Sequence, residues 1–165
     1  MKVLRSYSVY IMLLSLLFSC GKTEKQNQQY RPNVVLIVAD DLGWRDLSCY
    51  GNELVETPNL DKMAEEGILF STAYASCPVC SPTRAALLTG KNPVAVDITD
   101  YIPGKQGARG PRPEEKFIVP EFNQELPPEE LTLAEILKEY GYSTASIGKW
   151  HLGGEGYLPT EQGFD

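Results

Sequence analysis

Residues 34–39 form an unbroken apolar run, Val-Val-Leu-Ile-Val-Ala, which is rich in β-branched side chains. Such a run is typical of a strand buried on both faces, as in a parallel sheet that helices cover. Segments 68–74 and 142–147 are apolar enough to be further strands. The pattern predicts an α/β fold in which helices pack against a mainly parallel sheet.

Start and stop signals predict three helices between these strands, over about 57–67, 81–90 and 132–141, and each ends at a glycine. In the second helix, Ser81 is a good N-cap and Pro82 suits the first helical position. The third begins with a Thr-x-x-Glu capping box. Between the second and third helices, residues 91–130 show no clear periodicity, which is typical of a functional or disordered loop.

Cys80 precedes the second helix, and Arg84 lies one turn further along. Free N–H groups and the helix dipole favour an anion at a helix N-terminus, and the arginine can reach the same place. The position is electropositive, and a cysteine there is reactive. The alternative is an ordinary capped helix that follows a small buried cysteine.

Asp40 and Asp41 follow the first predicted strand directly. Ligands of open α/β sheets bind beyond the carboxyl ends of the strands, and two adjacent carboxylates repel unless a cation or proton relieves them. Ca²⁺ or Mg²⁺ is the natural partner of such oxygen ligands. Alternatively, one aspartate caps a turn and the other faces water.

Lys149 and His151 follow the third predicted strand and flank Trp150. In an extended segment, the two alternating side chains point the same way. His151 is the only histidine of the chain. Taken alone, a lysine here is usually solvated and a lone histidine near tryptophan is usually structural.

Three motifs together resemble the sulfatases, members of the alkaline phosphatase superfamily. Residues 80–90, which begin Cys-Ser-Pro-Thr-Arg, resemble the first sulfatase signature, and residues 141–153, which contain Gly-Lys-Trp-His-Leu-Gly, resemble the second. Segments 31–43 and 57–61 are similar to the family's N-terminus. The resemblance covers residue 31 to the end and implies the N-terminal part of an alkaline-phosphatase-like sandwich with a mixed, mainly parallel sheet.

The resemblance implies hydrolysis of sulfate esters. In the family, a maturation enzyme oxidises the cysteine that matches Cys80 to formylglycine. One hydroxyl of the aldehyde hydrate attacks sulfur, and deprotonation of the other then expels sulfate. Asp40 and Asp41 match the family's calcium ligands, and the formylglycine at position 80 joins that metal shell.

The remaining roles also follow from the resemblance. Lys149 matches a lysine that contacts the sulfate and the leaving-group oxygen, and Arg84 would stabilise charge on the sulfuryl oxygens. His151 matches a histidine that hydrogen-bonds the formylglycine, and it would act as general base in the elimination. A phosphonate monoester or phosphodiester hydrolase of the same superfamily, and a non-catalytic surface lipoprotein that binds glycans, stay open as alternatives.

Residues 1–19 have the features of a signal peptide, with a charged start and a short apolar run at 9–18. The sequence before Cys20 resembles the lipobox of bacterial lipoproteins, and residues 20–30 read as a polar tether. We therefore expect an exported protein that is lipid-anchored to the bacterial membrane through Cys20. A sulfated polysaccharide is a suitable substrate for such a protein. A plain secretory signal with an incidental cysteine is the alternative.

The 165 residues, 42% hydrophobic and 22% charged, suffice for one domain with a core. A net charge of −7 argues against nucleic acid as a partner, so an anionic group would need a local cluster of cations. By the resemblance, the 91–130 loop lies near the substrate entrance, where Arg109 and Arg112 could meet a charged glycan, and a solvated loop is the alternative. If Cys20 and Cys80 are modified, only Cys49 and Cys77 remain, although Cys77 and Cys80 also match a C-x-x-C redox motif.

The predicted metal site is poorly filled, because calcium takes about 6–8 oxygen ligands. The resembling family completes this shell with an Asp/Asn pair much further along the chain and adds a second histidine and lysine. None of these has a matching position here. We therefore expect residues 31–165 to be the N-terminal part of a sulfatase catalytic domain that is inactive alone.

Overall fold

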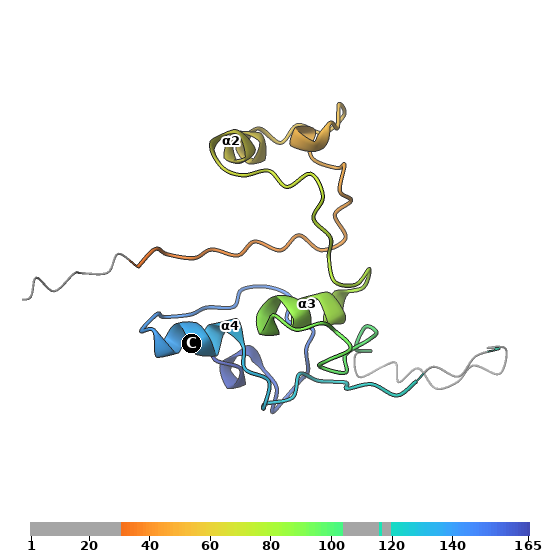
Figure 1. Ribbon diagram of the computed structural model, residues 1–165, viewed down its shortest axis with the longest axis vertical. Coiled ribbons are helices and arrows are strands. Elements are labelled where there is room, and N and C mark those ends of the chain that lie inside the picture. Colours follow the sequence, from red (N-terminus) through yellow and green to blue (C-terminus); the bar gives the residue numbers. More distant parts are fainter. Residues whose placement is uncertain (1–30, 104–115, 117–119) are drawn as a thin grey trace, which may run out of the picture. The chain divides into compact units, whose positions relative to one another are not determined.

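A computed structural model describes residues 31–103, 116 and 120–165 (Figure 1). The chain divides into two compact units, of which the second begins at Ala39 and contains every predicted site residue except Cys20. Several sequence predictions lie outside the described residues: the predicted signal peptide at 1–19, the predicted tether at 20–30 with Cys20, and the arginines Arg109 and Arg112. Within the described part, no helix is long and apolar enough to cross a membrane.

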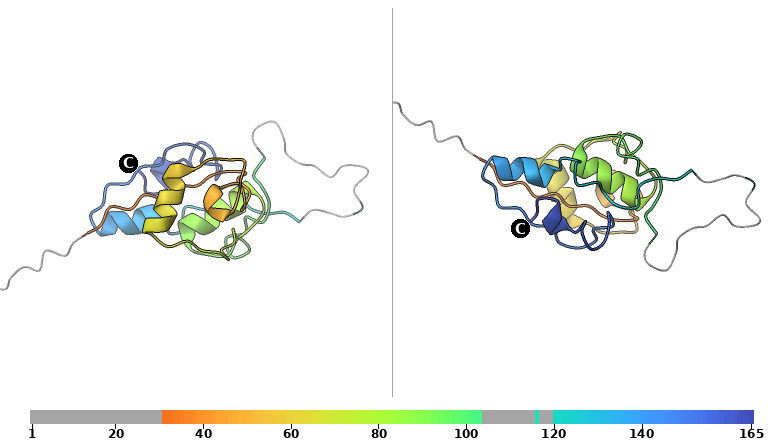
Figure 2. Two further views of the ribbon diagram at one scale, coloured as in Figure 1. Left: turned by 90° about the horizontal axis from the view of Figure 1, so that it is seen from above. Right: turned by 90° about the horizontal axis from the view of Figure 1, so that it is seen from below.

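All three predicted helices are confirmed, and two short 3₁₀ helices accompany them. In chain order the elements are η1 (Ser48–Tyr50), α2 (Pro58–Glu66), α3 (Cys80–Thr89), α4 (Leu133–Glu139) and η2 (Pro159–Glu161). Helices α3 and α4 lie side by side in both views of Figure 2.

The start of α3 differs from the prediction. The cap position is held by Val79, which makes no side-chain cap hydrogen bond, and Cys80 is the first helical residue. Ser81 is not the N-cap, because its buried hydroxyl accepts a hydrogen bond from the Ile102 amide instead. The end of α3 is as predicted: Gly90 has a φ of 68° and donates its N–H to the Ala86 carbonyl.

The capping box of α4 is confirmed. Thr132 Oγ1 accepts from the Glu135 amide, and Glu135 Oε2 accepts from the Thr132 amide at 2.7 Å. The Thr132 hydroxyl also donates to the Gln162 carbonyl at 2.8 Å. The start of α4 is thereby joined to the turn that follows η2.

The core of the described residues lies against α3. Its fully or nearly buried members are Ala85, Val96, Ile98, Ile102, Leu126 and Leu152. Four of these six belong to the 91–130 segment, whose sequence shows no periodicity. The segment is therefore structural where it is described: irregular turns, rather than a helix or strand, direct its apolar side chains inward.

The predicted sheet is not confirmed, since no residue in the described ranges belongs to a strand. The run at 34–38 is exposed rather than buried, with relative exposures between 44% and 80%. Ile68 is 80% exposed and Ile147 is 97% exposed, so the other two predicted strands are not covered either. A strand exists only through backbone hydrogen bonds to a neighbouring strand, so an apolar run alone does not produce one. The alkaline-phosphatase-like sheet stays a prediction.

Candidate active site

Four of the sequence-predicted site residues come together at the N-terminal end of α3. Lys149 Nζ donates hydrogen bonds to Asp40 Oδ2 and, at 3.2 Å, to Cys80 Sγ. Arg84 reaches the same carboxylate oxygen, at 3.5 Å from its NH2 nitrogen, and donates from NH1 to the Lys149 carbonyl at 2.5 Å. Residues 40, 80, 84 and 149 therefore form one polar cluster although they come from three parts of the chain.

The charges of this cluster are unbalanced. The hydrogen bond from Lys149 lowers the pKa of Asp40, and the Arg84 guanidinium acts in the same direction. In turn, the Asp40 carboxylate, followed by Cys80, raises the pKa of Lys149. Two cations thus face one carboxylate beside Cys80, and the excess positive charge favours an anion there.

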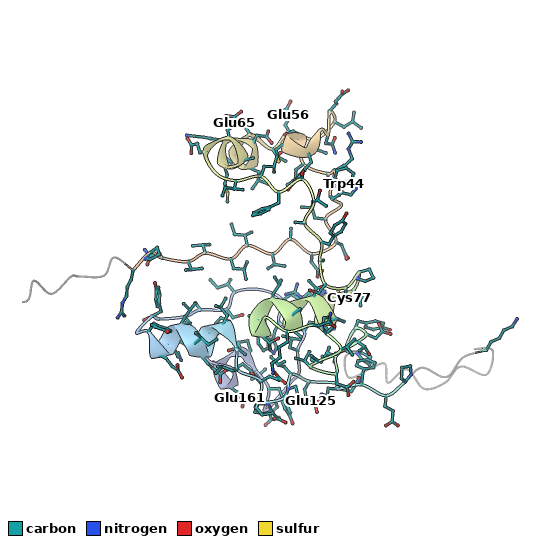
Figure 3. The ribbon with its side chains drawn as sticks, viewed as in Figure 1. Trp44, Glu56, Glu65, Cys77, Glu125 and Glu161 are labelled. Carbon is teal, nitrogen blue, oxygen red and sulfur yellow. The ribbon has the colours of Figure 1, made fainter. Side chains whose placement is uncertain are left out.

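The loop that leads into α3 is fixed by a residue that the sequence analysis missed. The Thr83 hydroxyl donates to the Cys77 carbonyl at 2.7 Å and accepts from the Cys77 amide at 3.1 Å. Cys77 therefore lies beside the first turn of the helix (Figure 3). The sequence contained a signal for this contact, because a threonine in the first turn of a helix often bonds backbone groups of the preceding loop.

His151 is placed differently from the prediction. The segment is not extended at this residue, because its φ is 60°, in the left-handed region that non-glycine residues rarely adopt. Lys149 is directed to Asp40 and Cys80, whereas His151 Nε2 lies 2.7 Å from the Ile102 carbonyl oxygen. The other ring nitrogen, Nδ1, is buried and has no hydrogen-bond partner among the described residues.

Asp41 also has a positive φ, 57°, in the turn after Asp40. The two carboxylates are the kind of ligand that Ca²⁺ or Mg²⁺ prefers. Among residues 31–103, 116 and 120–165, however, no three His, Cys, Asp or Glu side chains gather closely enough to hold a metal ion. The chemistry of the two carboxylates suits a hard cation, but in this arrangement Lys149 and Arg84 are paired with Asp40.

The thiols of Cys49, Cys77 and Cys80 are free. The C-x-x-C pair that begins at Cys77 is therefore in its reduced form, and no disulfide joins the cysteines that remain if Cys20 and Cys80 are modified.

Comparisons with known proteins agree with these motifs. The Sulfatase family model matches residues 32–165. Human steryl-sulfatase is 38% identical over 150 residues, which are 91% of this chain, and human arylsulfatase A is 46% identical over 136 residues, which are 81%. The chain belongs to the sulfatase family.

A solved structure supports the same assignment. The crystal structure of Ps i-CgsB is 34% identical to this chain, with a TM-score of 0.68 over 82% of this chain and 27% of that one. The same protein has been solved in complex with k-i-k-neocarrahexaose. This chain spans about a quarter of the length of the curated relatives, 23% of steryl-sulfatase and 24% of arylsulfatase A.

Proposed function

We propose that the protein hydrolyses sulfate esters and that the cluster at the start of α3 binds the sulfate group. The observation that carries this proposal is the pair of cations, Arg84 and Lys149, beside Cys80 at a helix N-terminus. The sulfate group of an ester is an anion with three terminal oxygens, and cations with helix N–H groups are the usual protein ligands of such groups. The names of the relatives, steryl-sulfatase and arylsulfatase A, support the same reaction class.

Each residue of the cluster has a distinct part in this proposal. Arg84 is held by its hydrogen bond to the Lys149 carbonyl and has a side chain only 14% exposed, so its guanidinium is fixed before substrate binds. The Lys149 side chain is more exposed, at 44%, and its ammonium donates to the Cys80 thiol at 3.2 Å. We assign to both the stabilisation of charge on the sulfuryl and leaving-group oxygens.

Two groups that are absent from the unmodified chain complete the proposal. Formylglycine made from Cys80 would supply a hydrated aldehyde as the nucleophile. A Ca²⁺ or Mg²⁺ ion held by Asp40, Asp41 and position 80 would supply Lewis-acid charge. With Nε2 bonded to a carbonyl, the neutral His151 ring keeps its Nδ1 lone pair, and this atom is our candidate proton acceptor.

We propose a sulfated glycan as substrate, supported by the complex of Ps i-CgsB with k-i-k-neocarrahexaose. An aryl sulfate tests the reaction class without knowledge of the glycan. After coexpression with a maturation enzyme, the whole protein that carries this chain, rather than the chain alone, should hydrolyse 4-nitrophenyl sulfate with a much higher kcat/KM than 4-nitrophenyl phosphate. The opposite preference would favour a phosphonate monoester or phosphodiester hydrolase.

The modification can be tested without turnover. Mass spectrometry of the peptide that contains Cys80 should show the aldehyde, or its hydrazone after trapping. An unmodified thiol in a protein that hydrolyses sulfate esters would overturn the proposed nucleophile. Binding of a sulfated glycan by unmodified protein, without hydrolysis, would favour the non-catalytic lipoprotein instead.

We also propose that Cys20 is the lipidated N-terminus and holds the protein at the bacterial membrane. Its support is the sequence alone, a short apolar run at 9–18 and the Leu-Phe-Ser-Cys sequence at 17–20. Cys20→Ala should move the protein from the membrane fraction to the soluble fraction. A variant that stays in the membrane fraction would show that the anchor lies elsewhere.

A further inference from the structure

Ile102 is held at both of its backbone polar groups. Its amide donates to the buried Ser81 hydroxyl at 3.0 Å, and its carbonyl oxygen lies 2.7 Å from His151 Nε2. Its side chain is 7% exposed and belongs to the core against α3. One core residue thus connects the second residue of α3 to the imidazole ring of His151.

The contact with Ile102 selects one form of the histidine. A carbonyl oxygen only accepts hydrogen bonds, so the proton of this pair is on Nε2. The neutral ring then has its lone pair on Nδ1, which is the buried atom without a partner in the described part of the chain. A φ of 60° at His151 indicates that the surroundings, rather than local preference, fix this residue.

The Ser81 hydroxyl serves the contact with Ile102 and not the capping of its own helix. It does not cap α3, its side chain is fully buried, and its oxygen accepts from the Ile102 amide. If the hydroxyl were lost, that amide would be buried without this partner and the 102 backbone would be free to shift. The carbonyl that holds the imidazole would shift with it.

We infer that Ser81 is a positioning residue for His151, acting through the backbone of Ile102 to hold the Nε2–H tautomer and leave Nδ1 as an acceptor. The inference rests on the proposed function for its catalytic meaning, since Nδ1 is the proposed proton acceptor. It also gives the second position of the Cys-Ser-Pro-Thr-Arg motif a purpose: α3, which carries Cys80, and the histidine are located by the same core residue.

The single histidine of the 165-residue chain makes a direct test possible. The chain is purified with a histidine-free affinity tag after selective ¹⁵N-histidine labelling. Two-bond and three-bond ¹H–¹⁵N correlation spectra are recorded at about pH 8, where an ordinary imidazole is neutral. The parent should show one protonated Nε2 and one unprotonated Nδ1. A parent spectrum of the Nδ1–H tautomer would overturn the inference without any variant.

Three variants separate positioning from general stability. Ser81→Ala should give averaged signals from both tautomers, whereas Ser81→Thr, which keeps a hydroxyl, should restore the parent spectrum. Thr89→Ala is the matched control, since it removes another hydroxyl of α3, one that donates to the Ala85 carbonyl at 2.8 Å. Its spectrum should match the parent.

The inference is overturned if Ser81→Ala keeps the parent tautomer, if Ser81→Thr behaves like Ser81→Ala, or if Thr89→Ala gives the same change. None of these spectra depends on turnover. If the whole protein fails to hydrolyse sulfate esters while this chain gives the expected spectra, the proposed function is refuted and the positioning role of Ser81 stays intact.

Discussion

Helices α2 and α3 share their local signals, since each has a proline in its first turn and a glycine directly after its last residue. Their surroundings are different. Helix α3 buries Ser81, Pro82 and Ala85 against the core, whereas α2 has no buried residue. Even the apolar side chains of Leu60 and Met63 on α2 are 41% and 60% exposed.

Helix α2 is joined to η1 by polar contacts instead. Ser48 Oγ donates to Asp61 Oδ2 at 2.5 Å, and Thr57 Oγ1 donates to Asp61 Oδ1 at 2.9 Å. The two hydroxyl oxygens are also 2.7 Å apart. The comparison teaches that the same start and stop residues specify a helix in either setting. Tertiary contacts then decide which helix carries the charged cluster of residues 40, 80, 84 and 149.

The largest expected effect is on the free energy of unfolding, and it distinguishes the core against α3 from the exposed helix α2. Ile98 is fully buried in the core against α3, so Ile98→Ala should lower the free energy of unfolding by about 2–5 kcal/mol. Leu60→Ala on α2 should cost less than about 1 kcal/mol, because the side chain is already 41% exposed. Urea unfolding of both variants measures the difference. Equal losses would show that α2 is packed as tightly as α3.

The glycines that end the two helices should respond differently to substitution. Gly90 has a φ of 68° and open space where a Cβ would lie, so Gly90→Ala should cost about 1–2 kcal/mol through backbone strain alone. Asparagine tolerates the left-handed conformation, so Gly90→Asn should cost less. At Gly67, with a φ of −119°, a Cβ would lie 2.9 Å from the Met63 carbonyl oxygen.

Substitution at Gly67 is therefore opposed by a steric clash, and asparagine should offer no advantage over alanine there. Urea unfolding of the four variants gives the test. A clear gain from asparagine at position 67, or none at position 90, would contradict the reasons given for the two helix ends.

The smallest expected effect is a loss of α2 stability at acid pH. The hydrogen bond from Ser48, and then that from Thr57, lowers the pKa of Asp61 below its ordinary 3.8. The stability that this carboxylate contributes is therefore complete above pH 3.8 and is lost as the pH falls through the lower folded pKa. On acidification from about pH 6 to about pH 3, the parent should lose more protection of α2 amides against hydrogen exchange than Asp61→Asn does.

Glu65→Gln is the control for this experiment, since it removes another carboxylate from the same helix (Figure 3). Its acid response should follow the parent. If Asp61→Asn also follows the parent, the polar contacts do not hold α2 in place.

The sequence predicted the helices and much of the site because both depend on local chemistry. Proline, glycine and a capping box act within one turn, so α2, α3 and α4 were placed to within about two residues. Asp40, Cys80, Arg84 and Lys149 were predicted from motifs, and the structure brings them together. What each of them does in catalysis stays a proposal.

Other features depend on distant partners, and the sequence did not reveal them. The Ser81 hydroxyl was expected to cap a helix and instead bonds Ile102, 21 residues away. The core residues at 96, 98 and 102 lie in irregular turns without a period to detect. The apolar run at 34–38 matched a buried strand, but a strand also needs a hydrogen-bonded neighbour, which periodicity cannot supply.

The central claim is that Lys149 and Arg84 form the sulfate site beside Cys80. The most direct test is the turnover of 4-nitrophenyl sulfate by a Lys149→Ala variant of the whole protein that carries this chain. The matched control is Lys91→Ala, which removes a lysine paired with Glu130 away from this cluster. Both are compared per mole of formylglycine at position 80, so that unequal maturation does not enter. Lys149→Ala should lower kcat/KM about 10²–10³-fold, as expected for loss of a group that stabilises transition-state charge, and Lys91→Ala should match the parent. Parental turnover by Lys149→Ala, or an equal loss in Lys91→Ala, would contradict the account.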